Sequence, residues 1–188
     1  MTADNTTQLV LALLGFALAA GVLGWSPYGR AVWAPACVAV LAAAAVLAAV
    51  ADDLSAGRVD VTILVALTGL LAVVGGGPVT TRIFAFVDRA DHDHDPQAGR
   101  QTLDQAGQVL RGGAWIGALE RLAVFAGLAA GFPEGVAVVL ALKGVGRFQD
   151  LRGDATSHGA ATERFIIGTF TSVLWAAACA GMVALVRR

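Results

Sequence analysis

Long apolar stretches separated by short polar ones divide the chain into six segments. A helix needs about 20 apolar residues to cross about 30 Å of hydrocarbon, and runs such as residues 32–51 and 165–186 meet that requirement. The pattern therefore predicts an all-α fold, a polytopic integral membrane bundle of six transmembrane helices. These helices are predicted over residues 9–24, 32–51, 61–77, 113–131, 133–148 and 162–186.

The fifth of these segments is the weakest. Only residues 136–142 are uninterrupted, because Glu134 precedes them and Lys143 follows them. Five full crossings and one re-entrant segment are therefore the alternative interpretation.

Basic residues favour six crossings and set the orientation. With the N-terminus outside, most of the 13 Lys and Arg residues lie on inner segments, in agreement with the positive-inside rule. A re-entrant fifth segment would remove this asymmetry. We thus predict a multi-pass protein of the inner (plasma) membrane with both termini outside. The inner set is Arg30, Arg82, Arg89, Arg100, Arg111, Lys143, Arg147, Arg152 and Arg164, and the outer set is Arg58, Arg187 and Arg188.

The segments form a single membrane domain in two halves, residues 1–77 and 113–188. A cytoplasmic loop over residues 78–112 joins them. Within it, residues 79–89 predict a short interfacial helix that turns apolar side chains such as Ile83 and Phe86 toward lipid. Three helices on each side of this loop allow a 3+3 arrangement of opposite orientation, as in inverted-repeat transporters, although the halves share no convincing similarity.

The composition excludes several classes of protein. Hydrophobic residues make up 57% of the chain and charged residues 14%, against about 25% in a soluble domain. A mean hydropathy of +0.71 and a net charge of -1 also exclude a disordered chain and a nucleic-acid-binding module. Cys37 and Cys179 lie inside apolar runs and are predicted to be packing residues.

Two charged residues lie where lipid should exclude charge. Glu120 and Arg121 are about seven or eight residues, or roughly 10 Å, into the fourth predicted helix. The tight link between this helix and the next predicts an antiparallel hairpin, in which Glu120 is opposite Gly144 and Arg121 is opposite Lys143. Lys143 and Arg147, one turn apart, can then both reach Glu120.

Small residues predict how the fourth helix packs. Gly113, Gly117, Gly127 and Gly131 share one stripe with Glu120 and include two GxxxG pairs. Such stripes let helix backbones approach closely in lipid. Glu120 is therefore predicted to point at protein.

Glu163 and Arg164, at the start of the last segment, complete a predicted cluster at one membrane depth. The cluster carries two more positive than negative charges, and two interpretations remain open. It is either a structural ion-pair lock whose spare basic side chains reach lipid headgroups, or a site for an anion, a lipid phosphate or a transported ion. Its members are Glu120, Arg121, Lys143, Arg147, Glu163 and Arg164.

Three short motifs in this second half resemble a known pattern. Residues 116–121 read I-G-x-L-E-R, residues 141–148 read A-x-K-x-x-x-R-F, and residues 163–172 read E-x-x-x-I-G-T-x-x-S. Over residues 112–172 the chain resembles the C-terminal membrane region of an uncharacterised family of bacterial polytopic membrane proteins, a domain of unknown function. The resemblance implies that the charged residues of these motifs act as one unit and implies no reaction.

A second, weaker candidate is a metal site in the central loop. Asp91, His92, Asp93, His94 and Asp95 offer alternating ligands for Zn²⁺ or a similar ion, but nothing fixes them, and a solvated acidic loop is the competing interpretation. The run Gly75-Gly76-Gly77-Pro78 lacks the lysine and hydroxyl of a phosphate loop and is interpreted as a flexible end of a membrane span. No cofactor is predicted.

Three function classes follow. The first is a small transport or channel protein; the second is a non-catalytic assembly or regulatory subunit; the third is an enzyme acting on a lipid phosphate with Glu120 as acid or base. Membrane lipids, including anionic headgroups, and a second copy or another membrane protein are the expected partners. No nucleic-acid partner is expected.

Overall fold

The computed structural model describes residues 3–26, 29–51, 57–92, 110–147 and 158–187, and within these residues all regular structure is helical. The all-α prediction is therefore confirmed. The helices are α1 (Ala3–Leu23), α2 (Arg30–Val50), α3 (Arg58–His92), α5 (Leu110–Ala129), α6 (Glu134–Arg147) and α7 (His158–Val186).

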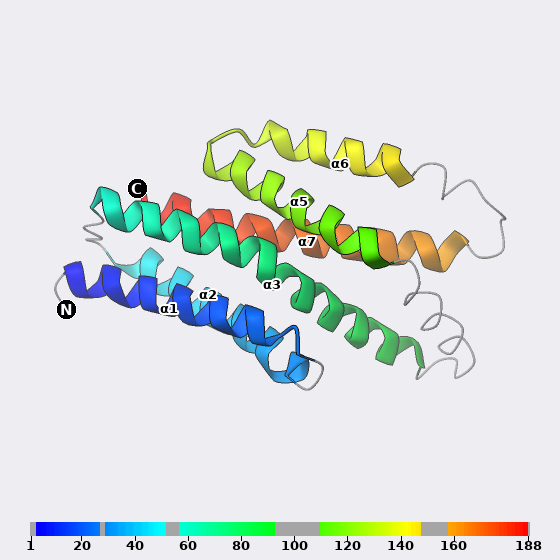
Figure 1. Ribbon diagram of the computed structural model, residues 1–188, viewed down its shortest axis with the longest axis horizontal. Coiled ribbons are helices and arrows are strands. Elements are labelled where there is room, and N and C mark those ends of the chain that lie inside the picture. The colour runs from blue at the N-terminus through cyan, green and yellow to red at the C-terminus, as the bar shows by residue number, and fades with distance from the viewer. Residues whose placement is uncertain (1–2, 27–28, 52–56, 93–109, 148–157, 188) are drawn as a thin grey trace.

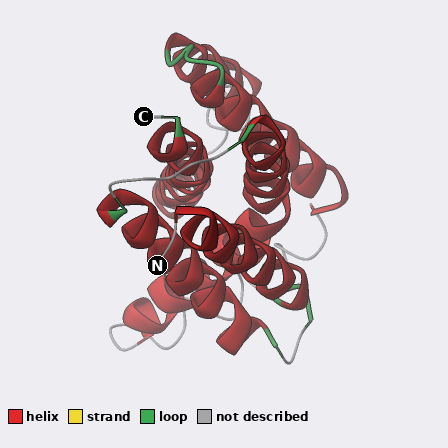
Figure 2. Cartoon of the chain, turned by 90° about the vertical axis from the view of Figure 1, so that its left-hand side faces the viewer, coloured by secondary structure: helices red, strands yellow, loops and turns green. Residues whose placement is uncertain are grey.

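The helices form one bundle around α3. This helix packs against α1, α2, α5 and α7, whereas α6 lies on the outside against α5. Figure 1 shows that α1, α3 and α6 run in one direction and that α2, α5 and α7 run back. Figure 2, which looks down the long axis of the bundle, shows the helices end-on. As a result, α1 begins and α7 ends at the same end of the bundle.

Four of the helices are long and apolar enough to cross a membrane. They correspond to the first three predicted spans and the last, and they cover Asn5–Leu23, Arg30–Val50, Arg58–Arg89 and Thr162–Val186.

The helices α5 and α6 differ from these four. With 20 residues, α5 extends over about 30 Å but carries Arg111, Glu120 and Arg121, while the 14 residues of α6 extend over only about 21 Å. In Figure 1 the turn between them stops short of the end of the bundle where α7 finishes. The sequence therefore predicted both α5 and α6 as helices. Of the six predicted membrane spans, however, only four are long and apolar enough among the described helices to cross a membrane.

The third helix continues well past its predicted end. The sequence placed the end of this span at Gly77 and a separate helix over residues 79–89, but α3 runs unbroken from Arg58 to His92 with Pro78 inside it. The helix continues because the segment beyond Pro78 packs on α7: Val79 is buried, and the Phe84 ring lies against Gly168. Residues 75–78, which the sequence analysis interpreted as a flexible end of a span, therefore lie in the middle of a long helix.

The hydrophobic core lies between α1, α2, α3 and α7. Leu14, Leu71 and Met182 are fully buried there, together with Cys37 and Cys179, whose thiols are free. By contrast, none of the described side chains of α6 is buried. The outermost helix is thus held by few contacts, most of them with α5.

Candidate functional site

The centre of the site is a run of three glycines in the middle of α3. A Cβ atom on Gly75 would lie 2.8 Å from Cζ2 of Trp175, and one on Gly77 would lie 2.8 Å from Cζ2 of Trp25. One on Gly76 would lie 2.6 Å from Nε of Arg121. Real Cβ atoms do not come this close to other atoms, so each glycine accommodates one large side chain from another element.

Two of these three side chains are indoles that bond the backbone of α3. Trp25 donates Nε1–H to the carbonyl of Val74 at 3.0 Å, and Trp175 donates to that of Leu71 at 3.2 Å. Pro78 explains the first bond, because proline has no N–H and so leaves the carbonyl four residues earlier, that of Val74, without its helical donor. The indole of Trp25 replaces the missing donor.

Arg121 enters the same region from α5. Only 7% of its surface is exposed. Its Nη2 donates to the carbonyl of Val73 at 3.1 Å and its Nη1 to Oγ of Ser172 on α7 at 3.5 Å, while Nε is buried with no described partner. The guanidinium therefore bridges α3, α5 and α7 through neutral acceptors, although burial of a charge normally calls for an opposite one.

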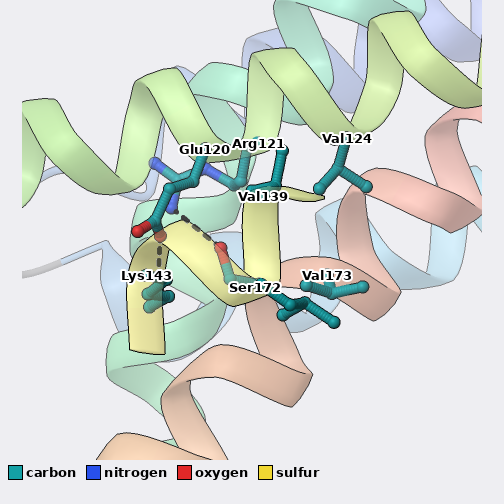
Figure 3. A pocket seen from close by; sticks show the side chains of 8 residues that line it. Glu120, Arg121, Val124, Val139, Lys143, Ser172 and Val173 are labelled. Carbon is teal, nitrogen blue, oxygen red and sulfur yellow. Dashed lines mark hydrogen bonds and ion pairs between the residues drawn. The ribbon is translucent and has the colours of Figure 1, made fainter. Parts of the chain in front are cut away.

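Glu120, the preceding residue, points the other way, toward α6. Lys143 donates Nζ–H to its carboxylate (Figure 3). The side chain of Lys143 is 20% exposed and that of Glu120 is 16% exposed. The Nζ atom also lies 5.9 Å from the centre of the Phe165 ring. This pair is the contact that the predicted hairpin register allows. Arg121 departs from that register, since it contacts α3 and α7 and not Lys143.

A small pocket lies between these charged groups. Its volume is about 10 Å³, which is room for roughly one water molecule. Leu140 lies on its wall and is 39% exposed, so the pocket reaches the surface of the bundle. The residues around it come from α5, α6 and α7 and are Glu120, Arg121, Val124, Val139, Leu140, Lys143, Ser172 and Val173 (Figure 3).

The other members of the predicted cluster lie elsewhere. Arg164 forms an ion pair with Asp88, between α7 and the extension of α3. Glu163 is exposed and forms no ion pair with a described residue. The side chain of Arg147 lies outside the described part of the chain. The structure thus brings together three of the six predicted charged residues, Glu120, Arg121 and Lys143.

The predicted packing glycines of α5 are less closely packed than those of α3. A Cβ on Gly117 would meet only Nη1 of Arg121 on the same helix, and one on Gly127 would meet only the carbonyl oxygen of Phe132 in the following turn. Gly131 has a φ of 79° and open space around it, which suits the tight turn into α6. Gly113 is exposed. Closer approaches between elements occur at residues 75–77 of α3 and at Gly168 of α7.

The candidate metal loop, residues 91–95, falls outside the described side chains. The side chains of Asp91 and His92, and all of Asp93, His94 and Asp95, lie outside the described residues. The described residues contain no group of His, Cys, Asp and Glu suited to a metal ion.

Sequence reasoning missed the residues that hold Arg121 in place. Trp25, Trp175 and Ser172 bond or pack here through partners about 50 or 100 positions away in the sequence. The sequence did contain one signal. A run of three glycines and a proline inside an apolar stretch, residues 75–78, is as compatible with a close approach of other elements as with a flexible end.

No family model, no curated protein and no solved structure matches the chain.

Proposed function

We propose that this chain is a small integral membrane protein of the transport type, with Glu120, Arg121 and Lys143 as its intramembrane ion site. The observation that carries the proposal is the charge balance around the pocket. Glu120 forms its ion pair with Lys143, which leaves the buried guanidinium of Arg121 without an ion pair of its own among the described residues. Ionisable groups at membrane depth are costly, and ion pathways are a common reason for keeping them.

The arrangement of the helices supports a particular topology for this protein. We propose four crossings, by α1, α2, α3 and α7, with α5 and α6 entering as a re-entrant hairpin from the end of the bundle where α2 begins. That end also carries Arg30, Arg82 and Arg164, whereas Arg58 and Arg187 lie at the opposite end. The positive-inside rule then keeps the sequence-based orientation, with both termini outside the plasma membrane.

Ion flux through proteoliposomes tests the transport proposal. The Glu120→Gln variant should still assemble, with lower stability, but should change the flux of small ions, because it leaves Lys143 without its carboxylate partner. Glu134→Gln is a matched control, since Glu134 is exposed at the start of α6. Absence of flux with the unmodified protein, or equal flux with Glu120→Gln, would contradict the proposal.

A second candidate function, a subunit of a larger membrane assembly, is favoured by the exposure of α6. Val138, Leu142 and Val145 are 56–74% exposed on a helix that packs mainly against α5. In this case the charged residues act as a packing lock and the exposed face binds another membrane helix. Co-purification of a second membrane protein, lost when Ala141→Phe adds bulk to this face, would support the assembly function over transport.

The third candidate, an enzyme acting on a lipid phosphate, has less support. A phosphate group with four oxygen atoms is much larger than the water-sized space beside Glu120. The resemblance of residues 112–172 to an uncharacterised membrane family remains a hypothesis and adds no reaction.

A further inference from the structure

We infer that the pocket beside Arg121 binds a small monatomic anion, a halide such as fluoride or chloride. This inference rests on the proposed function, because it names the ion that the same site takes. It is argued from the charge, the donors and the size of the pocket.

The charge of the pocket favours an anion. Three ionised side chains contribute to its wall: Glu120, Arg121 and Lys143. Because Lys143 donates to Glu120, the wall keeps one net positive charge, on a guanidinium that is 7% exposed. A monovalent anion would balance this charge, whereas a cation would add to it.

The donors are also those that an anion requires. Nη1 of Arg121 makes only a long bond of 3.5 Å, to Oγ of Ser172, and so keeps the capacity to donate to an anion. The hydroxyl of Ser172 accepts from Arg121 and can donate to an anion at the same time. The Glu120 carboxylate also contributes to the wall and would repel an anion, but the ammonium of Lys143 neutralises it.

The size and polarity of the pocket select the type of anion. A volume of about 10 Å³ accommodates a water-sized particle and is too small to enclose phosphate or sulfate, which carry four oxygen atoms. The remaining wall is apolar, with valines from three helices. Such a wall suits a monovalent ion better than a strongly hydrated polyvalent one, because less hydration energy is lost.

Halide binding can be measured on the purified full-length protein in detergent. We expect the unfolding temperature to rise with increasing sodium chloride relative to sodium gluconate at equal ionic strength, because a ligand of the folded state alone stabilises it. An equal unfolding temperature in chloride, fluoride and gluconate would overturn the inference.

Ser172→Ala provides the variant that tests the location. Losing a hydrogen bond to a charged species weakens binding by about tenfold or more, so the apparent Kd for chloride should rise by this factor. Thr169→Val is the matched control, because it removes another buried hydroxyl of α7 that does not reach the pocket. Equal loss of chloride affinity in both variants, or none in Ser172→Ala, would contradict a site at Ser172.

Two outcomes separate this inference from the transport proposal. Halide-dependent stabilisation without halide flux in proteoliposomes would support the anion site and contradict transport. Flux of protons or cations, with no halide effect on stability, would support transport and contradict the anion site.

Discussion

At the scale of single residues, the molecule depends on three positions that have no side chain. Gly75, Gly76 and Gly77 each receive a large side chain from a different element. All three side chains, Trp175, Arg121 and Trp25, donate hydrogen bonds to backbone carbonyls of α3. Because the contacts approach the backbone of α3 directly, even a methyl group at these positions has no space.

Adding a methyl group at Gly76 tests this packing. In Gly76→Ala the new Cβ would lie 2.6 Å from Nε of Arg121 and 3.0 Å from Cδ1 of Trp175, so the guanidinium must move. Overpacking of this kind costs about 1–3 kcal/mol, which a denaturation curve in detergent would measure.

The control for this variant is Gly181→Ala on α7. A Cβ there has nothing within 4 Å, so its stability should equal or slightly exceed that of the unmodified protein. If both alanine variants unfold at the same denaturant concentration, the glycines of α3 are not needed for close packing.

At the scale of helices, the outermost one is held mainly by a tight turn and one ion pair. Gly131 makes the turn, and Lys143 reaches back to Glu120 across the hairpin. Since no described side chain of α6 is buried, we expect the ion pair to matter more for the position of this helix than for a helix in the core.

Reversing the charges of this pair should reveal that contribution. Glu120→Lys alone, or Lys143→Glu alone, places two like charges together at a mostly buried site, and breaking a buried pair costs about 3–5 kcal/mol. The double variant should recover part of the loss. Thermal unfolding of all three variants in detergent gives the coupling energy.

A second ion pair in the chain serves as the comparison. Arg164 and Asp88 are more exposed, at 36% and 26%, so reversing them should cost no more than about 1 kcal/mol. Equal losses at the two pairs would show that the position of α6 does not depend on Lys143.

The local sequence pattern predicted where the helices lie better than it predicted which residues contact each other. Apolar runs located the six helices of the described residues, and a short turn between two of them placed Glu120 near Lys143. The pattern failed at Pro78, which usually interrupts a helix, because its effect is offset by a donor from Trp25, 49 positions from Val74. It also failed for Arg121, whose acceptors lie on two other helices. Contacts of this kind depend on the packed bundle and leave no periodic signal.

At the scale of the whole molecule, the direction of the helices constrains how the chain lies in a membrane. Because α5 and α6 run in opposite directions, the helix ends before and after this hairpin are on the same side whether the hairpin crosses fully or turns back. In the proposed membrane protein both termini would therefore lie on one side in either case, and only the position of the α5–α6 turn would distinguish four crossings from six.

Labelling with a membrane-impermeant maleimide locates this turn. The two native cysteines are fully buried and should react little. Ser26→Cys, between α1 and α2, should react from one side of the membrane, and Arg58→Cys, at the start of α3, from the other. Phe132→Cys, in the α5–α6 turn, should react from neither if the proposed topology holds, because the re-entrant turn would then lie within the bilayer. Reaction of Phe132→Cys from the same side as Arg58→Cys would establish six crossings.

The proline in α3 also has a consequence for how the protein is made. A helix that enters lipid with an unpaired carbonyl would be less stable. The donor for the carbonyl of Val74 is Trp25, which is synthesised before α3. The N-terminal helix pair can therefore receive α3 during its insertion. Arg121 and Trp175 are synthesised later, so their contacts with α3 can form only after these residues have emerged.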